Sequence, residues 1–417
     1  MKFETYHISE DIKKNLTGLG FLRPTDIQYK AIPSILKGED VLAIAQTGTG
    51  KTMAFAIPLI DMIHRGKSSK RTQGIKCLVM VPTRELAAQI GEVFNQLIKH
   101  TKVKVLAIFG GVEQDPQINK LVWGIDLLVA TPGRMFDLIS QGAINLDHLE
   151  TLVIDEADQM LDLGFINDIA AVKKKLKKRH QTLFFSATIN QEIKKLAFSQ
   201  VKTSAIRIQI SPEDPVSKNV SHYVMFVQMD DKRFFLRRFI TDHPEKRMIV
   251  FVRTRVRAER VFKALERGQI PSLTLHGEKD QKDRTAVMEA FKQGETNILI
   301  ATDISARGID VPNVHYVINY DLPDKTENYV HRVGRTGRGN KTGIALSYCS
   351  DEEKERLEEI QLFLKKEIET IPVTKDEYST TLSLSKSSQS IKDLFAEQDE
   401  WEEAIKKKKK KRRKKKS

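Results

Sequence analysis

The 417-residue chain lacks the usual means of covalent or metal cross-linking. It has two cysteines, Cys77 and Cys349, which lie far apart in apolar, strand-like runs. Two isolated cysteines exclude a disulfide framework or a zinc cluster, and we expect both to be buried. The sequence also has no apolar run near the roughly 18 residues that a membrane span needs, and Met1–Glu10 carries charges where a signal peptide is apolar. These absences predict a protein of the reducing cytoplasm.

The positive charge of the chain is concentrated at one end. The formal net charge is +14, but Lys406–Lys416 supplies eleven consecutive basic residues, and the rest of the chain carries +3. Eleven adjacent cations repel one another and cannot fold alone, so we expect a disordered basic tail. Ser379–Ser390 is also expected to be disordered, because its composition offers little apolar surface to bury. A short acidic amphipathic helix is expected from Ile391 to Ile405.

Short β-branched runs alternate with longer stretches of helical period along most of the chain. This alternation is typical of α/β domains with parallel sheets, and the length suits two such domains. The expected strands are 41–45, 77–81, 103–109, 127–130, 152–155 and 182–185, then 248–252, 272–275, 298–301, 316–319 and 344–348. Two prolines between Ser211 and Asn219 indicate a linker. We therefore expect a first domain over 1–210, a linker over 211–220, a second domain over 221–370 and a tail over 371–417.

A glycine-bearing turn follows the first expected strand. Its residues are Ala45, Gln46, Thr47, Gly48, Thr49, Gly50, Lys51 and Thr52. The amides of such a turn can surround a triphosphate at the start of a helix, with Lys51 on the outer phosphates and the Thr52 hydroxyl on Mg2+. A Gly/Thr-rich connection with no ligand is the alternative. The fifth strand ends in Asp155 and Glu156, which favours a nucleoside-triphosphatase: Asp155 suits Mg2+, and Glu156 suits the base for the attacking water.

These segments together resemble the DEAD-box family of ATP-dependent RNA helicases, over about Phe3–Tyr348. The resemblance implies two tandem RecA-like domains, each a parallel sheet flanked by helices, that bind ATP and Mg2+. It also implies that Gln28 hydrogen-bonds adenine, since an amide offers both a donor and an acceptor. Phe3 matches the family's isolated upstream aromatic and is implied to bind the nucleotide with Gln28. Without the later motifs, Gln28 would be a helix-start residue and Phe3 a packing anchor.

Further motifs extend the resemblance to RNA. The residues that it implies as RNA contacts are Arg84, Gly110, Gly111, Thr131, Pro132, Gly133, Arg134, Thr254 and Thr302. Arginines can donate to phosphate oxygens and glycines allow close backbone approach, so little sequence preference is expected. Taken singly, the Pro-Thr and Thr-Pro-Gly segments are also common turn sequences. Their order along the chain carries the resemblance.

The resemblance also implies residues that couple the two domains. They are Asp158, Ser186, Thr188 and His331, with a helix N-cap as the alternative for Ser186. Arg335 and Arg338 match the family's arginine-finger motif, in which guanidinium groups stabilise charge on the transferring phosphate once the domains close. Gln281 and Arg284 resemble RNA or interdomain elements, and Asp310 is implied to contact the ATP ribose.

The expected activity is RNA-stimulated ATP hydrolysis that separates short RNA duplexes. The partner would be single-stranded or short duplex RNA without sequence preference, and the core would be monomeric. The compact body with its basic extension resembles bacterial members that act on ribosomal particles, in RNA decay or in cold adaptation. The tail is expected to tether RNA electrostatically. An ATP-gated RNA clamp or scaffold with little unwinding and a DNA helicase stay open as alternatives.

Overall fold

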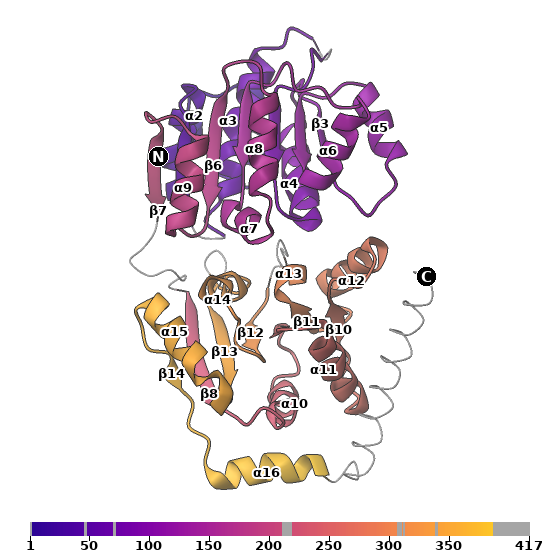
Figure 1. The fold of residues 1–417 in the computed structure, drawn as a ribbon, viewed down its shortest axis with the longest axis vertical. Coiled ribbons are helices and arrows are strands. Elements are labelled where there is room, and N and C mark those ends of the chain that lie inside the picture. Colours follow the sequence, from indigo (N-terminus) through magenta and orange to yellow (C-terminus); the bar gives the residue numbers. More distant parts are fainter. Residues whose placement is uncertain are drawn as a thin grey trace.

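The computed structural model describes residues 2–45, 48–69, 72–210, 219–306, 311, 313–337 and 341–386. The described residues form two α/β domains, domain 1 up to residue 210 and domain 2 from residue 219, which lie one above the other in Figure 1. Each domain holds one seven-stranded sheet in which every strand pair is parallel. The predicted fold class, two tandem RecA-like domains with parallel sheets, is therefore confirmed.

The sheet of domain 1 has the strand order β3-β4-β2-β5-β6-β1-β7. Its strands are β1 (Val41–Ala45), β2 (Cys77–Met80), β3 (Val105–Ile108), β4 (Leu127–Ala130), β5 (Thr151–Ile154), β6 (Gln181–Ser186) and β7 (Ile206–Ile210). Alternate residues of β1 point to opposite faces, as the two-residue period of a strand requires. Val41, Ala43 and Ala45 join one core, and Leu42 and Ile44 join the other.

Helices cover both faces of this sheet. One core is packed by α1 (Glu10–Gly18), α2 (Asp26–Leu36), α3 (Lys51–Arg65) and α4 (Arg84–Leu97), with the short η1 (Phe3–Thr5) beside them. The other is packed by α6 (Pro132–Ser140), α7 (Ala157–Asp162), α8 (Ile166–Lys175) and α9 (Gln191–Gln200). The remaining helix, α5 (Asp115–Val122), follows edge strand β3. Both faces of the sheet are thus buried, which explains the continuous apolar runs of its strands.

Domain 2 repeats the arrangement with the strand order β10-β11-β9-β12-β13-β8-β14. Its strands are β8 (Val220–Phe226), β9 (Met248–Val252), β10 (Leu273–Leu275), β11 (Ile298–Thr302), β12 (Tyr316–Asn319), β13 (Gly343–Cys349) and β14 (Glu369–Thr370). Its helices are α10 (Lys232–Asp242), α11 (Arg255–Arg267), α12 (Gln281–Gln293), α13 (Asp303–Ala306), α14 (Thr326–Val333), η2 (Asp351–Glu353), α15 (Lys354–Leu364) and α16 (Lys375–Lys386). Figure 1 shows α13 and α14 on the side of domain 2 that faces domain 1.

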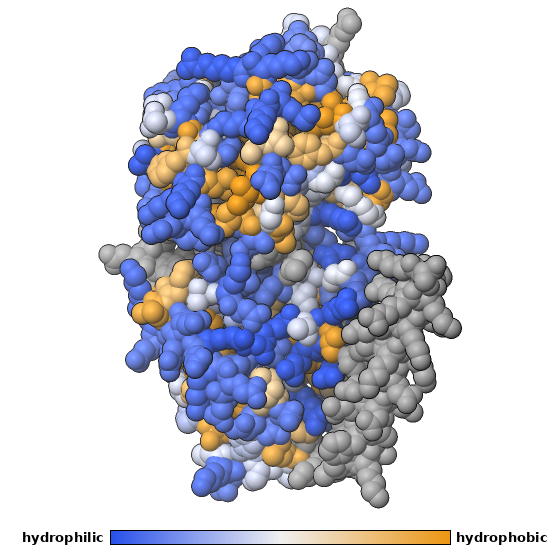
Figure 2. Space-filling view, in the orientation of Figure 1, coloured by the Kyte–Doolittle hydropathy of each residue, from blue (hydrophilic) through white to orange (hydrophobic). Residues whose placement is uncertain are grey.

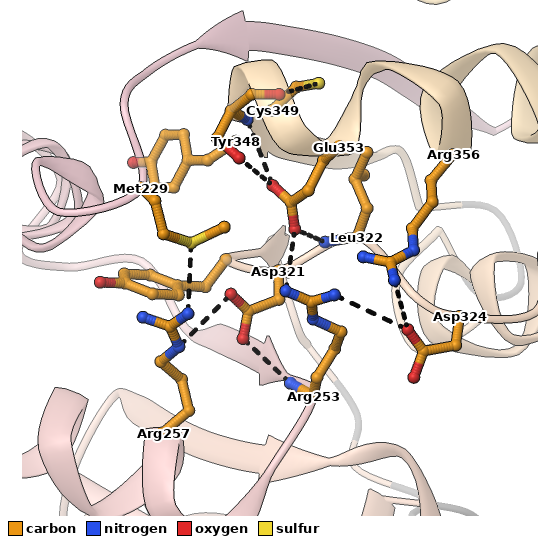
Figure 3. Close-up of polar contacts among 12 residues, drawn as sticks. Met229, Arg253, Arg257, Asp321, Leu322, Asp324, Tyr348, Cys349, Glu353 and Arg356 are labelled. Carbon is orange, nitrogen blue, oxygen red and sulfur yellow. Dashed lines mark hydrogen bonds and ion pairs between the residues drawn. The ribbon is translucent and has the colours of Figure 1, made fainter.

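A buried ion pair joins three elements of domain 2. Lys232 and Glu353 are both fully buried and paired, and Lys232 Nζ also donates to the carbonyls of Tyr320 (2.9 Å) and Tyr348 (3.0 Å). Glu353 Oε1 accepts from Leu322 N at 3.2 Å, as Figure 3 shows. Such a pair tolerates burial because hydrogen bonds satisfy its remaining donors and acceptors. It fixes the segment after β12, which leads into α14.

The strands expected from the sequence are all present, but three strands and one helix were missed. β7, β8 and β14 were not among the expected strands, and β8 already begins at Val220, the last residue of the expected linker. The expectation of disorder over Ser379–Ser390 is wrong as far as Lys386, because α16 covers that part. The rest of the linker and of the tail, with its expected acidic helix, lies outside the described residues.

A few specific contacts stabilise α16 despite its polar composition. The ring of Tyr378 packs on Phe235 with centroids 4.9 Å apart, and its hydroxyl donates to Asp231 at 2.7 Å. Arg238 Nη1 donates to Thr381 Oγ1 at 2.6 Å. These contacts dock α16 on α10. Across the described part of the chain, the helices are too short or too polar to span a bilayer.

Candidate active site

The glycine-bearing turn after β1 has the geometry of a phosphate cradle. Gly48 and Gly50 have φ of 82° and 92°, in the left-handed region that favours glycine. A Cβ on Gly50 would also lie 2.4 Å from Gln28 Nε2, so a larger residue would displace the Gln28 amide. α3 begins directly afterwards at Lys51, and its amino-terminal amides and dipole favour an anion. Gln46 and Thr47 lie outside the described residues.

Gln28 connects the adenine-reading segment to this turn. It completes a capping box with Thr25 at the start of α2, and its Nε2 donates to Gly50 O at 3.1 Å. The helix-start alternative for Gln28 is therefore correct as local structure, and it adds a contact that the sequence did not predict. Phe3 is 3% exposed, contacts the ring of Tyr6 and donates its backbone N–H to Leu22 O at 3.2 Å. Both adenine roles stay predictions.

Lys51, Asp155 and Glu156 form the buried centre of the site. They are 7%, 3% and 6% exposed. Within the described part of the chain, Lys51 Nζ and Glu156 Oε2 are buried without a hydrogen-bond partner. Buried polar atoms normally have partners, so these two fit a triphosphate and a water molecule as ligands. Glu156 also has φ of 50°, a strained conformation of the kind that collects at functional sites.

The electrostatics of the two acids differ from those of surface carboxylates. Burial raises the pKa of Asp155, although the charge of Lys51 opposes this. Burial, followed by the charge of Asp155, raises the pKa of Glu156 to about 7, while Arg335 and Lys51 lower it. A carboxyl with a pKa near neutrality is suited to take a proton from water.

Asp155, a buried carboxylate that follows β5, and Thr52, on the first turn of α3, are the expected protein ligands of Mg2+. Mg2+ usually binds through one or two protein side chains and phosphate oxygens of the substrate. Among the described residues, no group of three or more His, Cys, Asp or Glu side chains is placed to hold a metal ion. The ion would therefore depend on nucleotide oxygens for the rest of its ligands.

Asp158 links domain 1 to domain 2. Its Oδ2 accepts from Thr188 Oγ1 (3.1 Å), Thr188 N (3.1 Å) and Ala187 N (3.2 Å), and lies 3.6 Å from His331 Nε2 of α14. Burial would raise the pKa of Asp158, but the charges of His331 and Lys51 and the Thr188 hydrogen bond lower it. The Ser186 hydroxyl donates to Thr188 O at 2.9 Å rather than to Asp158, and the N-cap of α9 is Asn190. Ser186 therefore shapes the turn that holds Asp158.

The arginines of the finger motif have different surroundings. Arg335 is 5% exposed, donates from Nε to His331 O at 3.1 Å, and is close enough to Glu156 to lower the pKa of that acid. Arg332 is 1% exposed and binds Asp303, Asn319 and the carbonyl of Asp321. It is a structural residue that fixes α14. Arg338 and Asp310 lie outside the described residues.

The residues implied as RNA contacts follow the carboxyl ends of several strands. Arg84 follows β2, Gly110 and Gly111 follow β3, Thr131, Pro132, Gly133 and Arg134 follow β4, Thr254 follows β9, and Thr302 ends β11. Gly111 has φ of 77°, in the left-handed region that favours glycine, and the Arg84 guanidinium lies beside it. Arg134 Nη2 donates to Val112 O at 2.9 Å. The residues of this set that belong to domain 1 therefore lie at the carboxyl edge of its sheet, and Thr254 and Thr302 lie at that edge of the sheet of domain 2.

The two threonines of domain 2 make local contacts. Thr254 Oγ1 accepts from Arg257 N at 3.2 Å and caps α11. Thr302 Oγ1 donates to Ser305 Oγ at 3.1 Å and is 9% exposed. Their contacts with RNA stay predictions.

Two further ion pairs cross between the domains. Arg284 Nη2 lies 2.7 Å from Glu85 Oε1, beside a 3.4 Å hydrogen bond from Arg84 to Gln281. Lys325 Nζ lies 2.7 Å from Asp162 Oδ1. The sequence analysis assigned no role to Lys325 or Asp162. Neither residue belongs to a recognisable motif, so the sequence gives no indication that they form an ion pair.

Comparison with known proteins agrees with this site. Residues 25–196 match the DEAD/DEAH box helicase family and residues 231–340 match the helicase conserved C-terminal domain. The chain is 38% identical to the DEAD-box ATP-dependent RNA helicase CshA of Bacillus cereus, over 88% of this chain and 69% of that protein. It is 36% identical to the DEAD-box ATP-dependent RNA helicase RhpA of Helicobacter pylori, over 95% and 80%. The chain belongs to the DEAD-box family of ATP-dependent RNA helicases.

Solved helicase structures share the two-domain arrangement. S. cerevisiae Dbp5 bound to RNA and ADP BeF3 is 28% identical, with a TM-score of 0.80 over 93% of this chain and 99% of that one. The helicase Mss116 bound to single-stranded RNA and UDP-BeF is 27% identical, with a TM-score of 0.82 over 91% and 81%. Each comparison covers more than 90% of this chain, so it includes both domains. The two domains of this DEAD-box helicase are therefore arranged as in relatives that hold RNA and a nucleotide.

The raised pKa of Glu156 predicts a pH-dependent stability for this helicase without nucleotide. The pKa is about 7 in the folded protein against an ordinary value of 4.5, so the folded state binds the proton more tightly. The free energy of unfolding therefore falls as pH rises from about 4.5 to about 7. Glutamine does not titrate, so Glu156→Gln should not lose stability in this way as pH rises. We expect the difference in melting temperature, variant minus parent, to be more positive at pH 8 than at pH 5. Thermal melts at both pH values check this, and an equal difference at both would contradict it.

Proposed function

We propose that this helicase couples ATP binding to closure of its two domains on single-stranded RNA, and that hydrolysis resets it. One observation carries the proposal: Glu156 of domain 1 and Arg335 of domain 2 are both buried in one site, next to the Asp158 and His331 pair. Catalytic groups that come from both domains can act together only when the domains are closed. Hydrolysis would then depend on closure.

Each residue has a chemical role in this scheme. Lys51 binds the outer phosphates, and Glu156 orients the attacking water and accepts its proton. Arg335 stabilises the charge that develops on the transferring phosphate, because a buried guanidinium is fixed and permanently charged. Mg2+, held by Thr52 and Asp155, would offset phosphate charge when bound. Gln28 selects adenine through its amide. Phe3 contacts Leu22 and so supports the segment that leads to Gln28.

The RNA would lie across the loops that contain Arg84, Gly111 and Arg134. These groups can bind phosphates and approach the backbone closely, which positions a strand without reading its bases. An RNA strand that is held by both domains at once would be bent. The bent backbone would be incompatible with a duplex, so the bound strand would separate from its complementary strand. Local separation of a short duplex follows.

A comparison of RNA with DNA of identical sequence tests the function. We expect RNA to stimulate phosphate release strongly and DNA to do so weakly, because contacts to the 2′-hydroxyl distinguish the two. Equal stimulation would favour a DNA helicase. RNA binding that depends on ATP but releases no phosphate would favour the clamp. The presence of both Glu156 and Arg335 in the site supports turnover.

The ion pair between Lys325 and Asp162 is expected to favour the closed state. Exposed pairs contribute about 0.2–1 kcal/mol, so Lys325→Asp or Asp162→Lys should raise the RNA concentration for half-maximal ATPase about threefold. The double swap should restore much of the loss, since the charges are again opposite. RNA titrations of ATPase measure this. The pair Lys177 and Asp147, 2.9 Å apart within domain 1, is the matched control and should show no effect when reversed. Failure of the double swap to recover would contradict the role.

The basic tail is proposed to be a second, electrostatic contact for RNA. If about four of its cations neutralise phosphates, deleting 406–417 should reduce the log-log salt slope for single-stranded RNA by roughly 3. ATPase at saturating RNA should change little, because the proposed catalytic groups lie before Tyr348. Binding across a salt series, for the full and shortened chains, decides the matter. An unchanged slope would show that the tail does not bind RNA and has another role, such as keeping the protein soluble.

Likeness to bacterial helicases supports a cytoplasmic location. We also propose that the core is monomeric and that the RNA substrates include ribosomal particles or the RNA of decay complexes.

A further inference from the structure

An aromatic residue that belongs to none of the motifs described above is exposed on the outer edge of domain 1. Trp123 is 82% exposed and its neighbour Val122 is 80% exposed, at the carboxyl end of α5. Tryptophan is highly buried on average, so a nearly fully exposed one calls for a specific reason. Figure 2 shows apolar side chains at the surface of domain 1, while the visible face of domain 2 is mostly hydrophilic.

The charges around Trp123 are positive. Lys104 Nζ donates to the backbone carbonyl of Trp123 at 3.2 Å, which places an ammonium group beside this residue. Lys120 is exposed on the last turn of α5. Asp126 is the acid nearest in sequence, but it is 1% exposed and paired with Lys67 at 2.7 Å. The surface formed by Lys104, Lys120, Val122 and Trp123, here called the Trp123 patch, therefore suits an anionic partner with flat apolar groups.

The Trp123 patch is connected to the proposed RNA path by one short helix. Gly110 and Gly111 precede α5, and Trp123 directly follows it. Eight helical residues span about 12 Å. β3 is the edge strand of its sheet, so no further strand separates this side of domain 1 from solvent. An RNA strand that leaves the glycine loop at this edge can reach Trp123 with a few more nucleotides.

We propose that the Trp123 patch is an accessory site for single-stranded RNA, in which an unpaired base stacks on Trp123 and Lys104 and Lys120 bind the adjacent phosphates. Stacking on an aromatic ring does not depend on which base is present, and cations beside the ring follow the backbone. The site would lengthen the bound strand and retain RNA while the core opens. The inference rests on the proposed RNA path across Gly110 and Gly111.

The decisive experiment compares a short RNA that fills the core with a longer one that extends beyond it. Trp123→Ala is expected to weaken binding of the longer strand about tenfold, the scale of one stacked base, and binding of the short strand less than twofold. Trp123→Phe should retain most of the affinity. Leu362→Ala, at an 81% exposed residue of domain 2, is the matched control and should change neither. RNA-stimulated ATPase with saturating short RNA should stay unchanged in all three.

Fluorescence gives an independent measurement, because the chain has two tryptophans, Trp123 and Trp401. In a Trp401→Phe variant, the longer RNA should quench Trp123 and the short RNA should not. Lack of quenching, or an unchanged affinity of Trp123→Ala for the longer strand, would overturn the proposal. The proposal would also be overturned if sedimentation showed a dimer of the parent that Trp123→Ala dissociates. The Trp123 patch would then bind a second copy of this chain. If short RNA fails to stimulate the ATPase of the parent, the proposed function itself is wrong. The difference between long and short RNA tests only the accessory site, so the two failures can be told apart.

Discussion

Arg335→Ala is expected to lower the rate of RNA-stimulated ATP hydrolysis by about 10³-fold, with a much smaller change in ATP affinity. Arg335 comes from domain 2, is 5% exposed, and already lowers the pKa of Glu156. Its charge is needed most when negative charge develops on the transferring phosphate, so its loss raises the barrier more than it weakens the bound state. Single-turnover rates and a separate nucleotide titration measure the two quantities.

The control for this prediction is Arg335→Lys. Lysine keeps the positive charge but loses the planar, bidentate geometry, so it should recover only part of the rate. Similar losses in nucleotide affinity and in rate for Arg335→Ala would mean that Arg335 binds ATP and does not act on the transition state.

Glu156→Gln is expected to lower turnover at least about 100-fold, the scale for removing a positioned general base. Glutamine has nearly the same shape, so binding of ATP and RNA should persist. Steady-state phosphate release together with equilibrium binding of both ligands checks the prediction. Glu192→Gln, at an exposed acid of α9, is the matched control and should have parental activity. A normal ATPase rate in Glu156→Gln would remove Glu156 from the mechanism.

The chemistry of the nucleotide site could be predicted from the sequence because it is local. The turn around Lys51 and the acids Asp155 and Glu156 each follow an apolar strand directly, and parallel sheets place such segments at one edge. Arg332 and Arg335 have the same chemistry three positions apart, and the resemblance to the family motif, not local chemistry, singled out Arg335. The fold adds that Arg332 is enclosed by Asp303 and Asn319.

Contacts between distant, ordinary residues explain what the sequence did not predict. Lys325 and Asp162 are 163 positions apart and meet because of how the domains are arranged. The part of α16 from Ser379 on was read as disordered from its composition, which takes no account of the tyrosine just before it. Tyr378 docks the helix through a ring contact and a hydrogen bond, and both depend on α10 being in place.

The position of β1 in its sheet has a consequence for synthesis of the protein on the ribosome. β1 carries the phosphate-binding turn, yet it lies between β6 and β7, the last two strands of domain 1 to be made. At 5–20 residues per second, the interval between β1 and β7 is on the order of ten seconds. Until Ser186 has left the ribosome, β1 is an apolar strand with neither neighbour, and until Ile210 has left, it has only β6. A chain released before β6 is made would have the full phosphate-binding sequence and no nucleotide site.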